Sequence, residues 1–216
     1  MIFKDREDAG RELGWALAKF AGPDTIVLAI PRGGVVTGRA VAKALGCQLD
    51  IITPRKLKDP QDPELAIGAV TPDGNVYLNE RVIAVRGVDK SYIEKEARAE
   101  QKEAERRLKE FRGGRPYPNL KGKPVIIVDD GIATGATIIA AARDAKRLGA
   151  SRIIIAVPVI AESMIMEIAR EVDDFVYLVS SPMFVAVGQF YKRFGQVEDK
   201  EVIGILSDYW KPSPSA

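Results

Sequence analysis

The sequence contains no histidine, and this absence removes several kinds of chemistry at once. A Ser-His-Asp triad, a histidine general base and histidine metal ligands are all excluded. Cys47 is the only cysteine, so an internal disulfide and a thiolate metal cluster are excluded too. Because Cys47 follows Gly46 between an expected helix and an expected strand, we predict that it is a small buried apolar residue.

A large charge of one sign is also missing. The chain has 32 Lys and Arg against 30 Asp and Glu, a net charge of +2 without a block of like charge, so we expect no nucleic-acid partner. No apolar stretch reaches the length of a membrane span, and the N-terminal MIFKDREDAG is not a signal peptide, so we expect a cytoplasmic protein without a membrane partner. Few Asn, Gln and Cys, beside many Ile, Lys, Arg and Glu, favour a thermophilic source.

Apolar runs of strand length alternate with helical segments along the 216 residues. We predict strands over 25–30, 49–54, 124–130, 152–159 and 174–180, and helices over 35–46, 137–148 and 162–171. This alternation predicts an α/β fold with a mostly parallel central sheet flanked by helices and right-handed crossovers. The length suits one such domain.

Residues 55–120 interrupt the alternation, so we predict an insertion there. Its TPDGN stretch is a strong turn signal between two short strands, which predicts a hairpin. Residues 89–111 read as a highly charged helix with a narrow apolar stripe. The helix also contains three favourable i,i+4 charge pairs, namely Glu94–Arg98, Glu103–Arg107 and Glu105–Lys109.

The stretch VIIVDDGIATGAT, residues 125–137, has the features of an anion site. Gly131 and Gly135 allow a tight turn and a close backbone approach to a ligand. Thr134 and Thr137 add hydroxyl donors, and the helix that follows directs its free N–H groups at the same place. This half of the stretch favours a phosphate.

Asp129 and Asp130 precede that loop, at the carboxyl end of a predicted parallel strand, where ligands collect. Carboxylates repel a phosphate, so these two must bind another part of the same ligand. A vicinal diol offers two hydrogen-bond donors close together, and ribose 5-phosphate carries both a diol and a phosphate. We therefore predict a site that binds ribose 5-phosphate, with Asp129, Asp130, Gly131, Ala133, Thr134, Gly135, Ala136 and Thr137.

Other anion motifs fit this stretch less well. A Walker loop needs a lysine directly after its second glycine, and none follows Gly135. A Rossmann turn needs a different glycine spacing from that between Gly131 and Gly135. An aspartyl phosphatase of the haloacid dehalogenase type would have a second acid where Gly131 stands.

VIIVDDGIATGAT closely resembles the phosphoribosyl pyrophosphate (PRPP) signature of the type I phosphoribosyltransferases. LAIPRGG resembles the first strand and pyrophosphate loop of that family, and RKLKDP resembles the start of its mobile catalytic loop. With PELAIGAV and VGQFYKRFGQV, the chain is most similar to predicted phosphoribosyltransferases whose acceptor is unsettled. Independently of the resemblance, Gly33 and Gly34 leave backbone N–H groups open at a strand end, and Arg32 adds a planar cation that suits a pyrophosphate.

The resemblance implies transfer of ribose 5-phosphate from PRPP to a nitrogen acceptor, a nucleobase or related amine, with release of pyrophosphate. It implies Mg²⁺ held mainly through PRPP without direct protein ligands, a cis peptide in the PRGG loop, and a homodimer. We assign catalytic roles to Arg32, Arg55, Lys56 and Asp130, and rank Lys58 behind Arg55 and Lys56. Asp130, or Glu64 if it folds inward, would assist the acceptor.

In the family the acceptor pocket is a small hood outside the core. We therefore expect one domain over 1–210, with a core of about 22–54 and 121–180, a hood from 1–21 and 181–210, and a disordered tail at 211–216. Phe184, Phe190 and Tyr191 could stack on a flat acceptor, and plain core packing is the alternative.

Two other functions stay open. A PRPP-sensing regulatory protein without turnover would keep the site, although the intact PRGG and RK stretches favour an enzyme. A sugar-phosphate hydrolase would instead release inorganic phosphate from phosphomonoesters.

Overall fold

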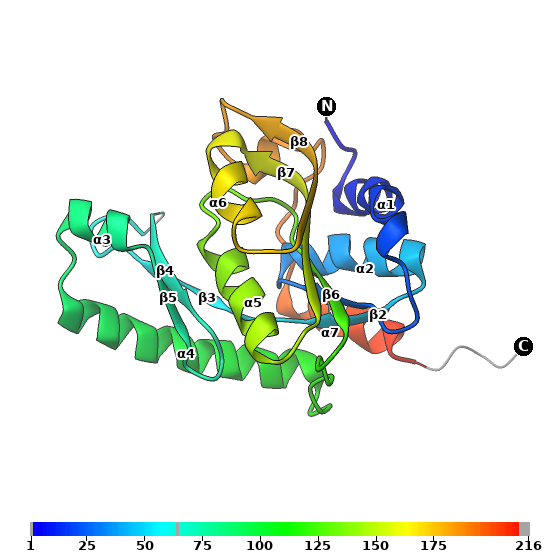
Figure 1. The fold of residues 1–216 in the computed structure, drawn as a ribbon, viewed down its shortest axis with the longest axis horizontal. Helices are drawn as coiled ribbons and strands as arrows, with labels where there is room; N and C mark the ends of the chain where they lie inside the picture. The colour runs from blue at the N-terminus through cyan, green and yellow to red at the C-terminus, as the bar shows by residue number, and fades with distance from the viewer. Residues whose placement is uncertain (1, 64, 212–216) are drawn as a thin grey trace, which may run out of the picture.

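A five-stranded parallel sheet forms the centre of the computed structural model, which describes residues 2–63 and 65–211 (Figure 1). The strands lie in the order β2-β1-β6-β7-β8. Their bounds are β1 (Ile26–Ala29), β2 (Gln48–Ile51), β6 (Pro124–Val128), β7 (Arg152–Ala161) and β8 (Asp174–Ser181). All four neighbouring pairs are parallel. The predicted α/β fold is confirmed, and each of the five predicted strands has its counterpart in this sheet.

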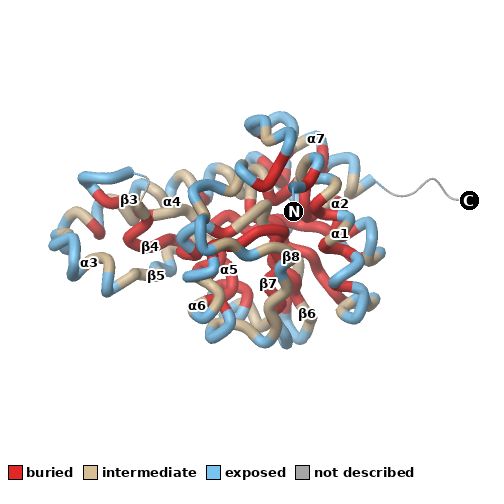
Figure 2. Tube along the Cα trace, turned by 90° about the horizontal axis from the view of Figure 1, so that it is seen from above, coloured by how far each residue is buried: buried red, intermediate tan, exposed pale blue. Residues whose placement is uncertain are grey.

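Helices cover both faces of the sheet. One face carries α1 (Arg6–Ala16), α2 (Gly33–Leu45) and α7 (Asp199–Tyr209), and the other carries α5 (Ala136–Arg147) and α6 (Ile165–Ala169). Side chains alternate along a strand, so Val27 packs on the face covered by α1, α2 and α7, and Leu28 packs on the face covered by α5 and α6. The central strands β1 and β6 are accordingly buried along almost their whole length (Figure 2), which explains their continuous apolar runs.

Short 3-10 helices complete this part of the chain, namely η1 (Ala18–Phe20), η2 (Glu162–Met164) and η3 (Val187–Phe190). The helix predicted over 162–171 is thus divided between η2 and α6. Gly46 ends α2 with a φ of 65°, a left-handed conformation that glycine adopts readily. Cys47, which follows it, is buried and free, as predicted.

The insertion forms a second, antiparallel unit that extends to the left of the central sheet in Figure 1. Its sheet has the order β3-β4-β5, with β3 (Arg55–Lys58), β4 (Ala66–Val70) and β5 (Val76–Leu78). The predicted hairpin is confirmed, because β4 and β5 pair on either side of the TPDGN turn. Two helices follow, α3 (Glu80–Arg86), which the sequence analysis missed, and α4 (Lys90–Arg112).

Arg55–Lys58 form a strand, with a shift of register between Leu57 and Lys58, where the sequence predicted the start of a mobile loop. Leu57 accounts for this difference: it is fully buried in a cluster with Ile67, Val70 and Ile93. That burial holds the backbone of β3 against β4, with Arg55 opposite Val70. The loop resemblance therefore applies at most to the residues that follow Lys58.

Helix α4 is amphipathic, as predicted. Ile93, Ala104 and Phe111 are buried, while its charged side chains form pairs along the solvent face. The Glu94–Arg98 and Glu103–Arg107 pairs are present at 3.7 and 2.7 Å. The third expected pair is replaced, since the carboxylate of Glu105 accepts a hydrogen bond from Gln101.

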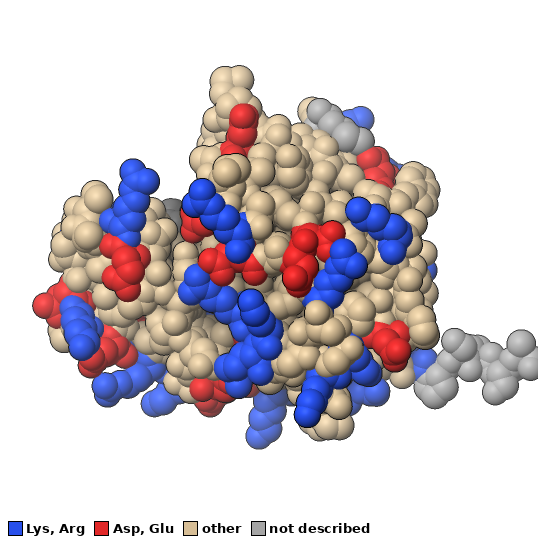
Figure 3. All heavy atoms as spheres, viewed as in Figure 1, with Lys and Arg blue, Asp and Glu red and all other residues tan. Residues whose placement is uncertain are grey.

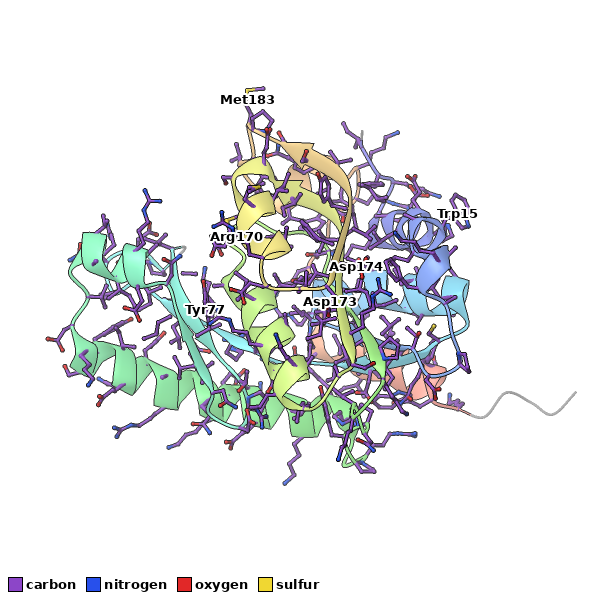
Figure 4. All side chains as sticks on the ribbon, viewed as in Figure 1. Trp15, Tyr77, Arg170, Asp173, Asp174 and Met183 are labelled. Carbon is purple, nitrogen blue, oxygen red and sulfur yellow. The ribbon has the colours of Figure 1, made fainter. Side chains whose placement is uncertain are left out.

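Tyr77 of β5 joins the antiparallel unit to the core (Figure 4). Its hydroxyl donates to Glu167 of α6 at 3.2 Å, and the Arg143 guanidinium of α5 lies 4.6 Å from its ring centroid. Burial, reinforced by Glu167, raises the pKa of Tyr77 to about 12, so the hydroxyl keeps its proton at neutral pH. The insertion therefore rests on α5 and α6, the two helices that follow the candidate site in sequence.

The N-terminal segment packs against the core and against the segment that follows β8. Phe3 exchanges backbone hydrogen bonds with Phe190 and Lys192, while Leu13 and Leu17 lie in the core cluster with α2 and α7. The segment 1–21, assigned to the hood, is thus partly a core element. Residues 212–216 of the expected disordered tail lie outside the described residues, as does Glu64.

Surface charge is mixed on the face shown in Figure 3, where acidic and basic side chains lie next to one another. This agrees with the small net charge of +2. Within residues 2–63 and 65–211, no helix has both the length and the apolar character needed to cross a bilayer.

Candidate active site

The two glycine-containing motifs singled out in the sequence meet at the carboxyl ends of β1 and β6, which are neighbouring parallel strands. A Cβ atom at Gly33 would lie 2.0 Å from Oδ2 of Asp130, and one at Gly34 would lie 2.8 Å from Oδ1 of Asp129. Any side chain at either position would therefore collide with the acidic pair. The PRGG loop and the acidic pair, about a hundred residues apart in sequence, form one site.

The PRGG loop leads directly into a helix. The Pro31–Arg32 peptide is cis, as the family resemblance implied, and α2 begins at Gly33. The first N–H groups of a helix have no partner inside it, and no side chain caps the N-terminus of α2. These N–H groups and the positive end of the helix dipole favour an anion beside the two carboxylates.

The small-residue loop after the acidic pair leads into a second helix in the same way. Helix α5 begins at Ala136, and Gly135 at its N-cap has a φ of 73°, which favours glycine. No side chain caps this N-terminus, and Ala133 and Thr134 are exposed. Ala133 and Thr134 of the predicted anion loop are thus open to solvent just before the start of α5.

Close packing holds this loop in place. A Cβ atom at Gly131 would lie 2.6 Å from side-chain atoms of both Val159 and Val187, and one at Gly135 would lie 2.7 Å from Met164. Ile132 also pairs with β7 through backbone hydrogen bonds to Val159 and Ala161. The loop backbone therefore has little freedom to move away from the acidic pair.

Asp129 and Asp130 strongly influence each other's ionisation. Burial raises the pKa of Asp129 well above its ordinary value, and the neighbouring charge of Asp130 raises it further. Burial also raises the pKa of Asp130, but Arg6 opposes this effect. The pair therefore resists carrying two negative charges until hydrogen-bond donors or cations are supplied.

Arg6 is a member of this site that the sequence analysis missed. Its Nε donates to Oδ2 of Asp130 at 2.6 Å, and its Nη1 donates to the carbonyl oxygen of Gly195 at 2.8 Å. Its guanidinium also lies 3.7 Å from the ring centroid of Phe194. Nothing in the charged stretch FKDRED distinguishes this arginine, because its partners lie more than a hundred residues away.

Arg32 lies on the other side of Gly33 and interacts with the C-terminal helix. Its Nη1 lies 3.3 Å from Oδ1 of Asp199, the first residue of α7, and both side chains are about one-third exposed. Arg32, Gly33 and Arg6 line a pocket of about 410 Å³ with the segment 194–197. Arg32 thus precedes the two glycines that pack against the acidic pair, and its side chain pairs with Asp199, a partner that was not foreseen; its catalytic role stays a prediction.

Arg55 and Lys56 lie in the antiparallel unit. Nε of Arg55 donates to Glu100 of α4 at 2.7 Å, and Lys56 lies next to it in β3, opposite Ala69. The contacts of Arg55 thus belong to the insertion and not to the acidic pair. A catalytic role for these two residues remains a prediction that requires the insertion to move.

The three aromatic residues proposed for the acceptor belong to one apolar cluster with Phe3 and Val159. Phe190 and Tyr191 are buried, and the Tyr191 hydroxyl donates to the backbone oxygen of Asp130 at 2.6 Å. Phe184 is only partly buried, with its ring centroid 5.3 Å from that of Phe190. The structure therefore supports core packing for two of these rings and leaves part of the third exposed.

The chain belongs to the phosphoribosyl transferase domain family, whose model matches residues 6–191. It is 42% identical over 205 residues to a Mycobacterium tuberculosis protein that carries the provisional name phosphoribosyl transferase. That match covers 95% of this chain and 46% of the relative, so the chain spans about half the length of the curated relatives it matches.

Two further comparisons found similar proteins. The crystal structure of TT1426 from Thermus thermophilus is 38% identical and has a TM-score of 0.82, with 97% of this chain and 99% of that chain covered. A ribose-phosphate pyrophosphokinase of Saccharolobus solfataricus is 41% identical over 101 residues, which is 46% of this chain and 31% of the enzyme. The likeness to TT1426 extends over both chains, insertion included.

Proposed function

We propose that the protein binds PRPP and transfers its ribose 5-phosphate to a nitrogen acceptor, with release of pyrophosphate. The family assignment supports PRPP as the substrate. The observation that carries the proposal is the direct packing of Gly33 and Gly34 against the carboxylates of Asp130 and Asp129. Such packing combines an anion-binding helix start with hydrogen-bond acceptors for a diol, as PRPP requires.

Each part of PRPP would have its own partner in this arrangement. The 5-phosphate would bind the loop of Gly131, Ala133, Thr134, Gly135, Ala136 and Thr137, at the uncapped start of α5. The ribose hydroxyls would donate to Asp129 and Asp130, and those donors would offset the cost of ionising both buried carboxyls. The pyrophosphate would bind the N–H groups at the start of α2.

The reaction breaks the bond between carbon 1 of the ribose and the pyrophosphate oxygen. Carbon 1 then passes through an oxocarbenium-like state, and negative charge develops on the leaving group. Arg32 and the loop N–H groups would stabilise that charge, with Arg32 exchanging Asp199 for the pyrophosphate. Asp130 would accept a proton from the acceptor as the new bond to carbon 1 forms.

Mg²⁺ is the metal that this chemistry implies. No group of three or more His, Cys, Asp or Glu side chains suited to a metal occurs in the part of the chain that the structure describes. We propose that the ion binds mainly through the oxygens of PRPP, because Mg²⁺ commonly binds through substrate phosphates and water. The bound metal would neutralise charge on the leaving pyrophosphate.

We place the acceptor next to the segment that follows β8. Val187 in this segment packs against Gly131, so the segment borders the phosphate loop. Phe184 has a partly exposed ring for a flat acceptor, and Phe190 and Tyr191 would support it from beneath. Met183, next to Phe184, is 81% exposed at the tip of this segment (Figure 4).

A screen of nucleobases and amines with PRPP and Mg²⁺, following pyrophosphate release, tests the proposed reaction. Acceptor-dependent release of pyrophosphate is the expected result. PRPP binding without turnover of any acceptor would favour the regulatory alternative. Release of inorganic phosphate from phosphomonoesters, without any response to PRPP, would favour the hydrolase.

Hydrogen exchange tests whether the insertion closes over the site. We expect the amides of the loop after Lys58 to exchange rapidly in the free protein and more slowly with PRPP or a pyrophosphate analogue, because closure excludes water. The amides of β6, most of which belong to buried residues, are the internal control and should exchange slowly with and without ligand. Equal exchange in the insertion with and without ligand would make it a rigid structural unit.

A further inference from the structure

Arg6 joins four segments that are far apart in the sequence. It belongs to α1, and its guanidinium contacts Asp130 after β6, Gly195 and Phe194. The fourth segment is the PRGG loop, since a Cβ atom at Gly33 would lie 2.9 Å from Nε of Arg6. The side chains of Arg6 and Asp130 are only 11% and 15% exposed. This is a largely buried ion pair, for which screening by solvent is weak.

The position of Arg6 on its helix indicates that the arginine serves the site and not the helix. Arg6 is the first residue of α1, where the helix dipole disfavours a positive charge. The neighbouring Glu7 and Asp8 follow the ordinary preference for acids in a first turn, and Asp5 caps the helix. Arg6 is thus unfavourable for the helix and favourable only through its distant contacts.

Several groups determine the charge of Asp130. Asp129 is the adjacent carboxyl, whose own pKa burial raises well above its ordinary value; the Tyr191 hydroxyl donates to the Asp130 backbone oxygen, and Arg6 supplies the positive charge in contact with the Asp130 carboxylate. Tyr191 stays neutral, because burial raises its pKa. Without Arg6, two neighbouring buried carboxyls would share one small volume, and one of them would take up a proton.

We propose that Arg6 is a positioning residue of the PRPP site, which holds the Asp130 carboxylate charged and directed at the ribose hydroxyls while it ties α1 and the segment 194–195 to the site. This inference rests on the proposed function, because it concerns the same carboxylate. Arg6 itself acts through Asp130. Its guanidinium donates to Oδ2 of Asp130 and also contacts Gly195 and Phe194. These contacts fix its position at the edge of the site.

The decisive experiment is a double-mutant cycle of Arg6 and Asp130. Titration calorimetry measures the dissociation constant of PRPP for each variant across about pH 6 to 9. We expect Arg6→Gln to weaken binding roughly 10-fold or more at the acidic end, and less as pH rises, because Asp130 then ionises without help. Dividing the dissociation constant of the variant by that of the wild type at each pH cancels the effect of ionisation of PRPP itself. Arg6→Lys should recover part of the loss, since it restores the charge without the planar fork.

In an Asp130→Asn background, Arg6→Gln should change the dissociation constant less than about twofold, because no carboxylate is left to hold. Arg11→Gln is the matched control: Arg11 lies on the same helix, is 52% exposed and pairs only at the surface with Asp8. It should leave binding and its pH dependence unchanged. The carboxyl ¹³C resonance of Asp130 gives a readout without ligand, and its titration should move to higher pH in Arg6→Gln.

Three results would overturn this role. Arg6→Gln could bind PRPP with the wild-type constant and pH profile, or weaken it equally in the wild-type and the Asp130→Asn backgrounds, or leave the Asp130 resonance unmoved. In each case the wild type still binds PRPP, so the proposed function survives. Loss of PRPP binding in the wild type itself would instead remove the proposed function. Circular dichroism of each variant confirms folding, and Arg6→Lys carries the test if Arg6→Gln unfolds.

Discussion

Replacement of Arg32 by alanine is expected to lower the turnover rate by about 10²–10³ while changing PRPP affinity far less. Arg32 lies beside Gly33 at the predicted pyrophosphate position, and charge grows on the pyrophosphate only as its bond to carbon 1 breaks. An interaction that strengthens in the transition state raises the rate constant more than it tightens the substrate complex. Steady-state kinetics with an identified acceptor, or pyrophosphate exchange, measures the effect.

Two variants give this experiment its controls. Arg32→Lys keeps the charge but loses the planar fork, so it should recover only part of the rate. Lys43→Ala removes an exposed cation from the last turn of the same helix and should leave the kinetics unchanged. If Arg32→Ala raises the Michaelis constant for PRPP and leaves the rate constant intact, Arg32 contributes only to binding.

Replacement of Asp129 by asparagine should have opposite effects on binding and on stability. A charge-assisted hydrogen bond contributes roughly 1.5–3 kcal/mol, so PRPP affinity should fall about 10- to 150-fold. The free energy of unfolding should increase, because the variant no longer has to accommodate a buried carboxyl whose pKa lies well above its unfolded value. Asparagine keeps an oxygen that can accept the Asp130 backbone N–H, as Asp129 Oδ1 does now.

The sign of the pH dependence follows from the raised pKa of Asp129. Between the unfolded and the folded pKa the folded chain binds more protons, so wild-type stability falls as pH rises through that window. Each unit of pKa elevation corresponds to about 1.4 kcal/mol. The advantage of Asp129→Asn should therefore grow from acidic to alkaline pH, which urea denaturation at several pH values measures.

Asp144 offers a matched control for this prediction. Burial raises its pKa too, but it lies in the last turn of α5, away from the loop at the start of that helix. Asp144→Asn should preserve PRPP binding. An Asp129→Asn variant that binds PRPP as tightly as the wild type would show that the carboxylate does not contact the ribose.

The centre of the sheet could be predicted because β1, β6 and β7 are buried along almost their whole length and so appear as continuous apolar runs. The hairpin and α4 could be predicted because TPDGN and the i,i+4 pairs are local signals. Helix α3 was missed, since none of its residues is buried and its seven residues carry little periodicity. Strand β3 was misjudged because the contacts that hold it, such as the burial of Leu57 and the Arg55–Glu100 ion pair, are made with residues elsewhere in the chain.

The site followed the same division between local and distant signals. The two loops that begin α2 and α5 could be found in the sequence, because each needs glycine at fixed positions beside a strand end. The interaction partners of the charged residues beside these loops could not be found in the sequence. Arg6 reaches Asp130 across 124 residues, and Arg32 reaches Asp199 across 167, without a sequence pattern that connects them.

The most direct test of the account is the thermal stability of the protein with and without PRPP and Mg²⁺. At a PRPP concentration 100 times the dissociation constant, the account predicts about 2.7 kcal/mol of added stability and a higher melting temperature. Gly33→Ala, whose Cβ would lie 2.0 Å from Asp130 Oδ2, should show no such rise. An unchanged melting temperature of the wild type at millimolar PRPP would contradict the account, whatever the acceptor.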